Sequence, residues 1–183
     1  MASPRRIVRL YAALSASAAD IQSSLAASGG ASKTVTLLIE KDPVRLLTRW
    51  GEEMVELCGV LDGSHNDSYL MEATQTFYWA SLYAAVRASP WEELQFDQVR
   101  RLAATCGVGT VPELRTAIAR LVALGATAKP TKLFLLWCVA ERMYRVMTPP
   151  DKQWSLEQLM EADLQDMKKK PYFQPLLAQI TEE

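Results

Sequence analysis

The stretch that decides the fold is residues 42–61, which read DPVRLLTRWGEEMVELCGVL. Asp42 is a typical helix N-cap, and Pro43 suits the first helical position because its missing N–H would have no partner there. Apolar side chains then recur at three- and four-residue spacing along one face, at Leu47, Trp50, Met54, Leu57, Cys58 and Leu61. We predict an amphipathic helix over 42–61 that ends before Gly63, which can take the left-handed cap conformation.

The rest of the chain carries helix signals and few strand signals. An amphipathic first helix is indicated by Leu10, Leu14, Ile21 and Leu25. Further helices are predicted from about 67 to 88, from the capping boxes that start at Ser89 and Thr110, over 131–147, and from Ser155 to the Lys168–Lys170 cluster. Residues 34–40 are an apolar run of ambiguous type. No Asn-Gly hairpin or sustained two-residue alternation occurs, so we predict an all-α helical bundle.

The length of 183 residues suits one well-buried core. We therefore expect a single all-α domain over 1–183. Within it, residues 1–32 would form an N-terminal helix and a flexible linker, residues 42–88 a helix pair, and residues 89–183 additional helices.

Charge and hydropathy limit the partners of the chain. The formal net charge is -1, with 20 basic and 21 acidic residues, so we expect binding neither to a nucleic acid polymer nor to a membrane surface. No apolar run approaches the roughly 20 residues that cross a bilayer. Residues 1–19 contain arginine, alanine and serine in the manner of a transit peptide, but their apolar spacing favours an ordinary helix, and we expect a cytoplasmic protein.

Cysteine and histidine usage excludes several chemistries. Cys58, Cys106 and Cys138 are widely spaced within apolar helical patterns, as reduced core thiols are. His65 is the single histidine, and there is no Cys-x-x-Cys pair. The sequence thus argues against thiolate or imidazole metal sites and against serine or cysteine triads.

Acidic residues gather on two neighbouring predicted helices. Glu52, Glu53 and Glu56 lie on the flank and back of the 42–61 helix, close to Arg49. One explanation is an ordinary solvated face, with Arg49 paired to Glu52 or Glu53 within the helix. The other is that carboxylates at this spacing hold a hard divalent cation together with an acid of the next helix.

Glu72 favours the second explanation. It is the only formally charged residue between Ser68 and Val86, and a helical projection places it on an apolar face. Burial of an unpaired carboxylate costs several kcal/mol unless a cation, a metal or a proton compensates it. The compensation comes either from a cation shared with the preceding helix or from an arginine, the candidates being Arg87, Arg142 and Arg145.

These residues resemble a known family. Glu53-x-x-Glu56 followed by Glu72-x-x-Gln75 is similar to the Glu-x-x-Glu and Glu-x-x-Asp signature of the all-α nucleoside triphosphate pyrophosphohydrolases. That superfamily includes the MazG-like proteins, the dimeric dUTPases and the phosphoribosyl-ATP pyrophosphohydrolases. The Gly-Glu-Glu entry at Gly51 and the Phe77-Tyr78 pair also resemble the family, and the resemblance spans roughly residues 44–86.

The resemblance implies a MazG-like helical bundle that requires Mg²⁺ (or Mn²⁺), assembles as a homodimer or homotetramer, and cleaves the α-β phosphoanhydride of a nucleotide. It implies the following site residues: Glu53, Glu56, Glu72 and Gln75 as metal ligands, Glu52 or Glu53 orienting the attacking water, and Arg49, Tyr78 and Trp79 contacting the nucleotide, with Arg45 or Lys41 as further phosphate contacts. Gln75 replaces the aspartate of the family, which removes one negative charge and should weaken metal binding. Trp79 stands where the phosphoribosyl-ATP branch often has histidine, which disfavours that branch.

Two other classes of function stay open. The apolar segments 69–86 and 133–137 also suit a non-catalytic helical oligomerisation or regulatory protein. Residues 99–108 have a spacing similar to a helix-turn-helix, but Pro112 and Glu113 fall within the would-be recognition region, and the net charge does not favour DNA.

Overall fold

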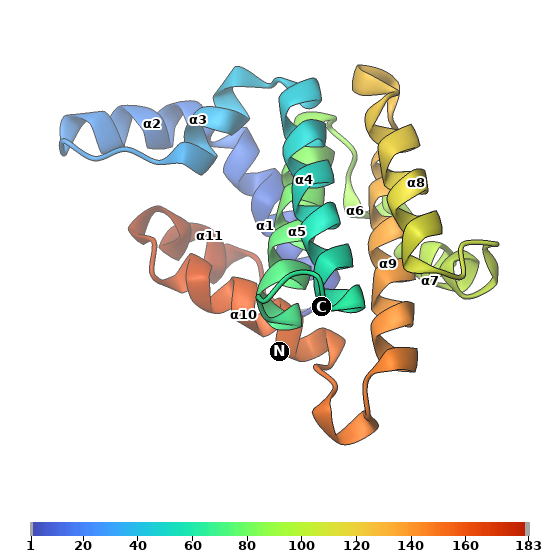
Figure 1. Ribbon diagram of the computed structural model, residues 1–183. Helices are drawn as coiled ribbons and strands as arrows, with labels where there is room; N and C mark the ends of the chain where they lie inside the picture. The colour runs from blue at the N-terminus through green and yellow to red at the C-terminus, as the bar shows by residue number, and fades with distance from the viewer. Residues whose placement is uncertain (1, 182–183) are drawn as a thin grey trace.

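The computed structural model describes residues 2–181, and this part of the chain is helical with no β-strand, as the sequence predicted (Figure 1). The α-helices are α1 Pro4–Ala16, α2 Ala18–Ala27, α3 Lys33–Glu40, α4 Pro43–Asp62, α5 Tyr69–Val86, α6 Trp91–Leu94, α7 Phe96–Thr105, α8 Val111–Val122, α9 Pro130–Met147, α10 Leu156–Lys168 and α11 Gln174–Gln179. Short 3₁₀ turns lie at Gly125–Thr127, Pro150–Lys152 and Pro171–Phe173.

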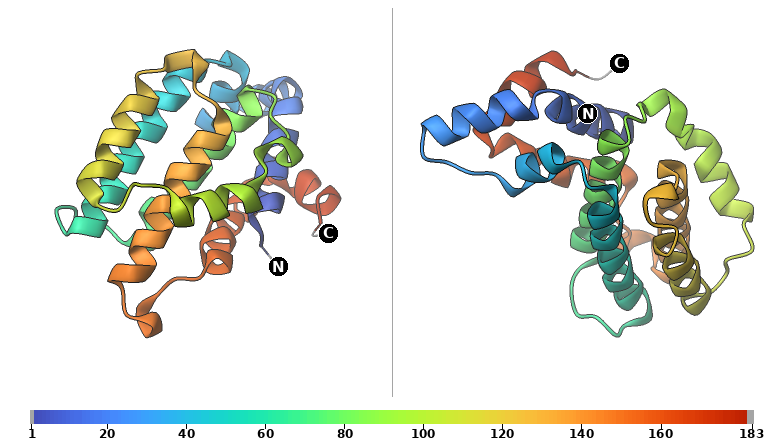
Figure 2. Two further views of the ribbon diagram at one scale, coloured as in Figure 1. Left: turned by 90° about the vertical axis from the view of Figure 1, so that its right-hand side faces the viewer. Right: turned by 90° about the horizontal axis from the view of Figure 1, so that it is seen from above.

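Helix α5 occupies the centre of the fold. It packs along α4, and it also contacts α1, α9 and α10. Figure 2 shows α2 and α3 on one side of the α4–α5 pair and α7, α8 and α9 on the other. The apolar residues of these helices form a continuous core, in which Trp50, Phe77, Phe134 and Trp137 are almost fully buried. Two helices with acidic sequence motifs therefore lie side by side at the middle of the molecule.

The predicted signals of α4 are confirmed. Asp42 Oδ1 accepts hydrogen bonds from the backbone N–H groups of Val44 and Arg45, at 3.0 and 3.1 Å, and Gly63 follows the helix with φ 77°. Gly51 has a packing role, because a Cβ atom there would lie 2.6 Å from Val122 Cγ2 of α8. The missing side chain lets α8 approach α4 closely.

Three local expectations differ from the structure. The predicted first helix is divided at Ser17 into α1 and α2, since the Ala-Ser sequence around it offers no large apolar side chain to the core. The segment after Ser89 is divided at Gln95, whose φ of 49° turns the chain so that the residues on both sides of it, Leu94 and Phe96, become buried. The predicted capping box at Ser89 does not form. Pro90 occupies the N-cap position of α6, and no side chain there accepts a hydrogen bond from the first turn of the helix.

Other helix boundaries agree with the predictions from the sequence, and one further helix is added to them. Thr110 and Glu113 form the predicted capping box of α8, and the ambiguous run 34–40 is part of α3. Beyond α10 the chain continues into α11, which the sequence analysis did not predict, and Phe173 before it packs edge-on against Tyr11. A search of the described helices finds none with the length and apolar character needed to cross a bilayer.

Candidate functional site

Two of the motif carboxylates are buried between α4 and α5. Glu72 is 1% exposed, as its apolar surroundings predicted, and Glu53 is 5% exposed, although the helical projection placed it on the solvated flank of α4. The projection failed for Glu53 because α5 covers that flank. Glu52 and Glu56 are exposed.

Arg49 neutralises part of this acidic surface. Its Nη2 donates to Glu53 Oε1 at 2.9 Å, its Nη1 is paired with Glu52, and its guanidinium lies 5.5 Å from the ring centroid of Trp79. Burial raises the pKa of Glu53 above its ordinary value and the nearby Glu56 raises it further, whereas Arg49 and a hydrogen bond from Trp79 lower it. The pairing of Arg49 with Glu52 and Glu53, which was one of the two explanations from the sequence, is therefore present, but Glu53 is buried rather than solvated.

No arginine or lysine among the described residues is paired with Glu72. Its Oε2 atom is buried and accepts no hydrogen bond. Burial raises the pKa of Glu72, and Glu56 and Glu53 raise it further. A buried carboxylate facing two others is the arrangement that a shared cation stabilises.

The three arginines considered as partners of Glu72 bind elsewhere. Arg87 donates to the carbonyl of Ala126, and Arg142 donates to the carbonyls of Ala104 and Val108. Arg145 is paired with Glu141 one helical turn before it. No ion pair of the described residues joins any of them to Glu72, so the alternative of a structural arginine is not realised.

The group closest to Glu72 that can carry a positive charge is the histidine of the chain. His65 Nε2 lies 3.6 Å from Glu72 Oε1, and single ligand atoms of Glu56, His65 and Glu72 all lie within 4.8 Å of one another. As the single histidine of the chain, His65 gives no sequence pattern typical of a metal site. The sequence shows that it lies in the loop between the two motif helices, but its approach to the acids is a property of the fold.

A pocket of about 740 Å³ adjoins the carboxylate cluster and is bounded by α4, α5 and α10. It is lined by five of the residues that the resemblance implied: Arg49, Glu53, Gln75, Tyr78 and Trp79. Glu53 therefore belongs to both features, since it lines the pocket and interacts electrostatically with Glu56 and Glu72. The volume lies within the range of small-molecule sites.

The pocket-lining side chains differ in how firmly other residues hold them in place. The Tyr78 hydroxyl shares a hydrogen bond of 2.9 Å with Thr34 Oγ1, and its ring lies edge-on to Tyr11 and Trp79 at 5.3 and 5.1 Å, so it is fixed as part of the wall. Trp79 is half-buried and lines the pocket, with the Arg49 guanidinium over its ring. Glu52, Arg45 and Lys41 do not line the pocket, and Arg45 is instead paired with Glu40.

Helix α10 contributes a group that the sequence analysis missed. Asp163 lines the pocket, is 5% exposed, and accepts a hydrogen bond of 2.8 Å from the Tyr11 hydroxyl on Oδ1, while Oδ2 has no partner among residues 2–181. Burial raises the pKa of Asp163 to about 7. Lys169 and Lys170 line the same wall, where Lys170 is paired with Asp166. The sequence does indicate that Asp163 is buried, because it lies at a position of α10 where the helical spacing otherwise places apolar residues.

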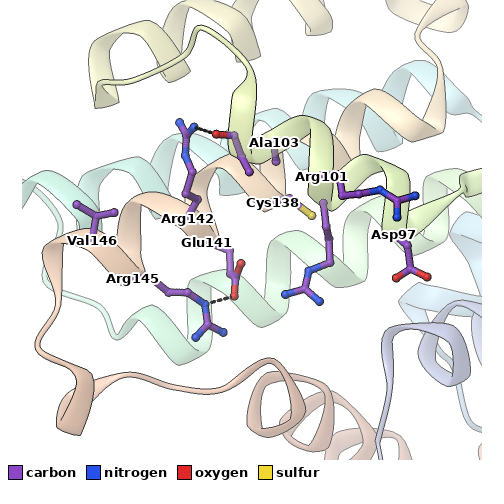
Figure 3. A pocket seen from close by; sticks show the side chains of 10 residues that line it. Asp97, Arg101, Ala103, Cys138, Glu141, Arg142, Arg145 and Val146 are labelled. Atoms are coloured by element: carbon purple, nitrogen blue, oxygen red, sulfur yellow. Dashed lines mark hydrogen bonds and ion pairs between the residues drawn. The ribbon is translucent and has the colours of Figure 1, made fainter.

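A second hollow, of about 650 Å³, lies between α7 and α9 and is rich in arginine (Figure 3). Its buried acid, Glu141, is already paired with Arg145, and Arg142 points away from it toward the end of α7, where it binds backbone carbonyls. Arg100 and Arg101 are exposed. This hollow offers positive charge, but none of its lining residues within 2–181 has a buried nitrogen or oxygen that lacks a hydrogen bond, which distinguishes it from the α4–α5 site.

Comparison of the chain with known protein families, with characterised proteins and with solved structures finds no match.

Proposed function

We propose that the chain is a divalent-cation-dependent nucleotide pyrophosphohydrolase of the MazG-like all-α type. It would bind a nucleoside triphosphate in the pocket beside α5, with Mg²⁺ or Mn²⁺ at the α4–α5 carboxylates, and cleave the α-β phosphoanhydride to release pyrophosphate. By its resemblance to that superfamily it would act as a homodimer or homotetramer.

The single observation that carries the proposal is the state of Glu72. It is buried, one of its oxygens accepts no hydrogen bond, and the neighbouring acids Glu56 and Glu53 raise its pKa. A purely structural carboxylate at a helix interface would be expected to have an arginine, a lysine or several N–H donors around it. The described residues give Glu72 no such environment, which supports a cation as its missing partner.

The donor set fits a divalent ion. Glu56 and Glu72 present carboxylate oxygens within 4.8 Å of each other, and Glu53 lies one turn before Glu56 on α4. Oxygen donors with this density of negative charge suit Mg²⁺ and Mn²⁺. Such an ion supplies charge neutralisation for the triphosphate and for the leaving pyrophosphate.

The residues around the pocket account for the other requirements of the reaction. Arg49, Lys169 and Lys170 line the pocket and are the cationic groups that would contact phosphate oxygens. Arg49 is paired with Glu52 and Glu53 and Lys170 with Asp166, so these two would exchange a carboxylate for a phosphate on binding. Trp79 offers an aromatic surface for a base, whereas Tyr78 serves as rigid wall because Thr34 holds its hydroxyl. Glu53 is suited to accept a proton from water, because burial raises its pKa and a carboxylate with a higher pKa is a stronger base.

The test is release of pyrophosphate from a panel of nucleoside triphosphates in the presence of Mg²⁺ or Mn²⁺. We expect a nucleoside monophosphate and pyrophosphate as products, since cleavage between the β and γ phosphates would instead give a diphosphate and phosphate. Glu53→Gln and Glu72→Gln should abolish release. Glu93→Gln, which makes the same charge change at an exposed position on α6, should not.

Full activity in Glu72→Gln would refute the proposal, and so would products of β-γ cleavage. Circular dichroism of each variant separates a loss of chemistry from a loss of fold. A wild-type protein that hydrolyses no member of the panel would favour the second candidate.

That second candidate is a non-catalytic helical oligomerisation protein. Val146 and Met147 at the end of α9 favour it, because they are 83% and 55% exposed and two exposed apolar side chains together suit burial against another chain. Analytical ultracentrifugation of wild type and Val146→Lys tests this directly, with dissociation expected if these residues form the contact.

A further inference from the structure

His65 lies in the loop that joins the two motif helices, and this loop folds back onto the end of α4. The backbone N–H of His65 donates to the carbonyl of Gly59 at 3.0 Å. A Cβ atom on Gly59 would lie only 2.7 Å from the Cβ atom of His65. The loop can therefore approach α4 this closely because residue 59 has no side chain, and the imidazole is held against the carboxylate cluster.

The ring nitrogen that faces the cluster lies near two carboxylates. His65 Nε2 is buried, 2.9 Å from Asp67 Oδ2 and 3.6 Å from Glu72 Oε1, and it makes no hydrogen bond with the described residues. Glu72 Oε2 is the second buried polar atom of the cluster that no described residue satisfies. Two unsatisfied ligand-type atoms, one nitrogen and one oxygen, thus occur in a single small region.

The spacing of these atoms suits a metal ion. Ligand atoms bound about 2.1 Å from one ion are separated from one another by roughly 3 to 4 Å. His65 Nε2 and Glu72 Oε1 are 3.6 Å apart, and Glu56 completes a group whose atoms all lie within 4.8 Å.

A charged imidazolium explains the cluster less well. It would pair with Asp67 at 2.9 Å and with Glu72 Oε1 at 3.6 Å, and among the described residues it would leave Glu72 Oε2 without a partner. The groups around it are the carboxylates of Glu53, Glu56, Asp67 and Glu72, and Arg49 is occupied by Glu52 and Glu53. One imidazolium would leave the cluster with an excess of negative charge, which a divalent cation at its centre would neutralise more fully.

We propose that His65 is a metal ligand, and that Glu56, His65 and Glu72 form a mixed nitrogen and oxygen site for a first-row transition metal ion. Mg²⁺ prefers oxygen donors alone, whereas Mn²⁺, Co²⁺ and Zn²⁺ accept an imidazole nitrogen, and affinity rises from Mn²⁺ to Co²⁺. The site therefore binds Co²⁺ and Mn²⁺ more tightly than Mg²⁺. This inference rests on the cation site of the proposed function and names the ion that the site selects.

The test exploits the single histidine of the chain. In protein without a histidine tag, pulsed electron paramagnetic resonance of bound Mn²⁺ should show coupling to an imidazole ¹⁴N nucleus, which only His65 can provide. Calorimetric titration should give a tighter dissociation constant for Co²⁺ than for Mg²⁺. His65→Asn should remove the nitrogen coupling and weaken Co²⁺ binding about tenfold or more, while changing Mg²⁺ binding little.

Controls keep the two proposals apart. Glu93→Gln, with its exposed side chain on α6, should bind Co²⁺ as wild type does, and circular dichroism should show that His65→Asn is folded. Mn²⁺ binding without nitrogen coupling, together with unchanged Co²⁺ affinity in His65→Asn, would overturn the role of His65 and leave a carboxylate site intact. If wild type binds none of the three ions, the transition-metal site is overturned, and the pyrophosphate assay decides the proposed function separately.

Discussion

Replacement of Asp163 by asparagine should change the way in which the stability of the protein depends on pH. Burial raises the pKa of the Asp163 carboxyl from 3.8 to about 7. Well below pH 3.8 this group is protonated in both the folded and the unfolded chain. Between about pH 4 and pH 7 the unfolded chain loses the proton while the folded chain keeps it, so the free energy of unfolding of wild type falls as pH rises.

The size of the effect follows from the two pKa values. A difference of about three pH units at 1.36 kcal/mol each gives a loss of about 4 kcal/mol across the window. The substituted asparagine carries no such charge and keeps an oxygen for the Tyr11 hydroxyl, so Asp163→Asn should lack this slope. An amide N–H without a partner costs about 1 to 3 kcal/mol at every pH. This cost lowers the free energy of unfolding of the variant by the same amount throughout and does not change how that free energy depends on pH.

The assay is urea unfolding of wild type and Asp163→Asn, followed by circular dichroism at several pH values between about 4 and about 8.5. Other titrating groups act on both proteins alike, so the difference between the two curves isolates residue 163. We expect the variant to gain stability relative to wild type as pH rises towards neutrality, with no further gain above about pH 7 to 8. Curves that stay parallel over the whole range would refute the reasoning, because Asp163 would then titrate as a solvated carboxyl does.

Three further predictions concern packing and the proposed cation site. Gly51→Ala should lower the free energy of unfolding by about 1 to 3 kcal/mol, because the new Cβ atom would overlap Val122; unchanged urea stability would show that α8 adjusts freely. Gln75→Asp should tighten Mn²⁺ binding in calorimetric titration, since it adds a carboxylate beside the proposed site, and an unaltered dissociation constant would place residue 75 outside that site. Trp137→Phe should cost about 1 kcal/mol or more, because the 2.9 Å hydrogen bond from its indole to the Ala73 carbonyl is lost, and a thermal melt equal to that of wild type would contradict this.

The sequence predicted the features that depend on neighbours along the chain. The cap at Asp42 and the left-handed Gly63 follow from local chemistry, and both are present. The burial of Glu72 was also predictable, because it is the one charge within an apolar helix. In each case a short stretch of sequence contains the whole physical cause.

The features that sequence reasoning missed depend on residues that meet only in the folded chain. Glu53 is buried because α5 covers the flank of α4, which a helical projection of α4 alone does not show. Asp163 reaches Tyr11 across 152 positions of sequence. His65 joins the acids through a loop whose approach depends on Gly59, and nothing in the local pattern specifies that approach.

The central claim is that the buried carboxylate of Glu72 serves a bound divalent cation, and calorimetric titration of Mn²⁺ into wild type and Glu72→Gln tests it most directly, since no substrate has to be known. Glutamine keeps the shape of the side chain and removes its charge. The account predicts that wild type binds Mn²⁺ and that Glu72→Gln, while still folded, has lost that binding. Absence of binding in wild type, or equal binding in the two proteins, would contradict the claim.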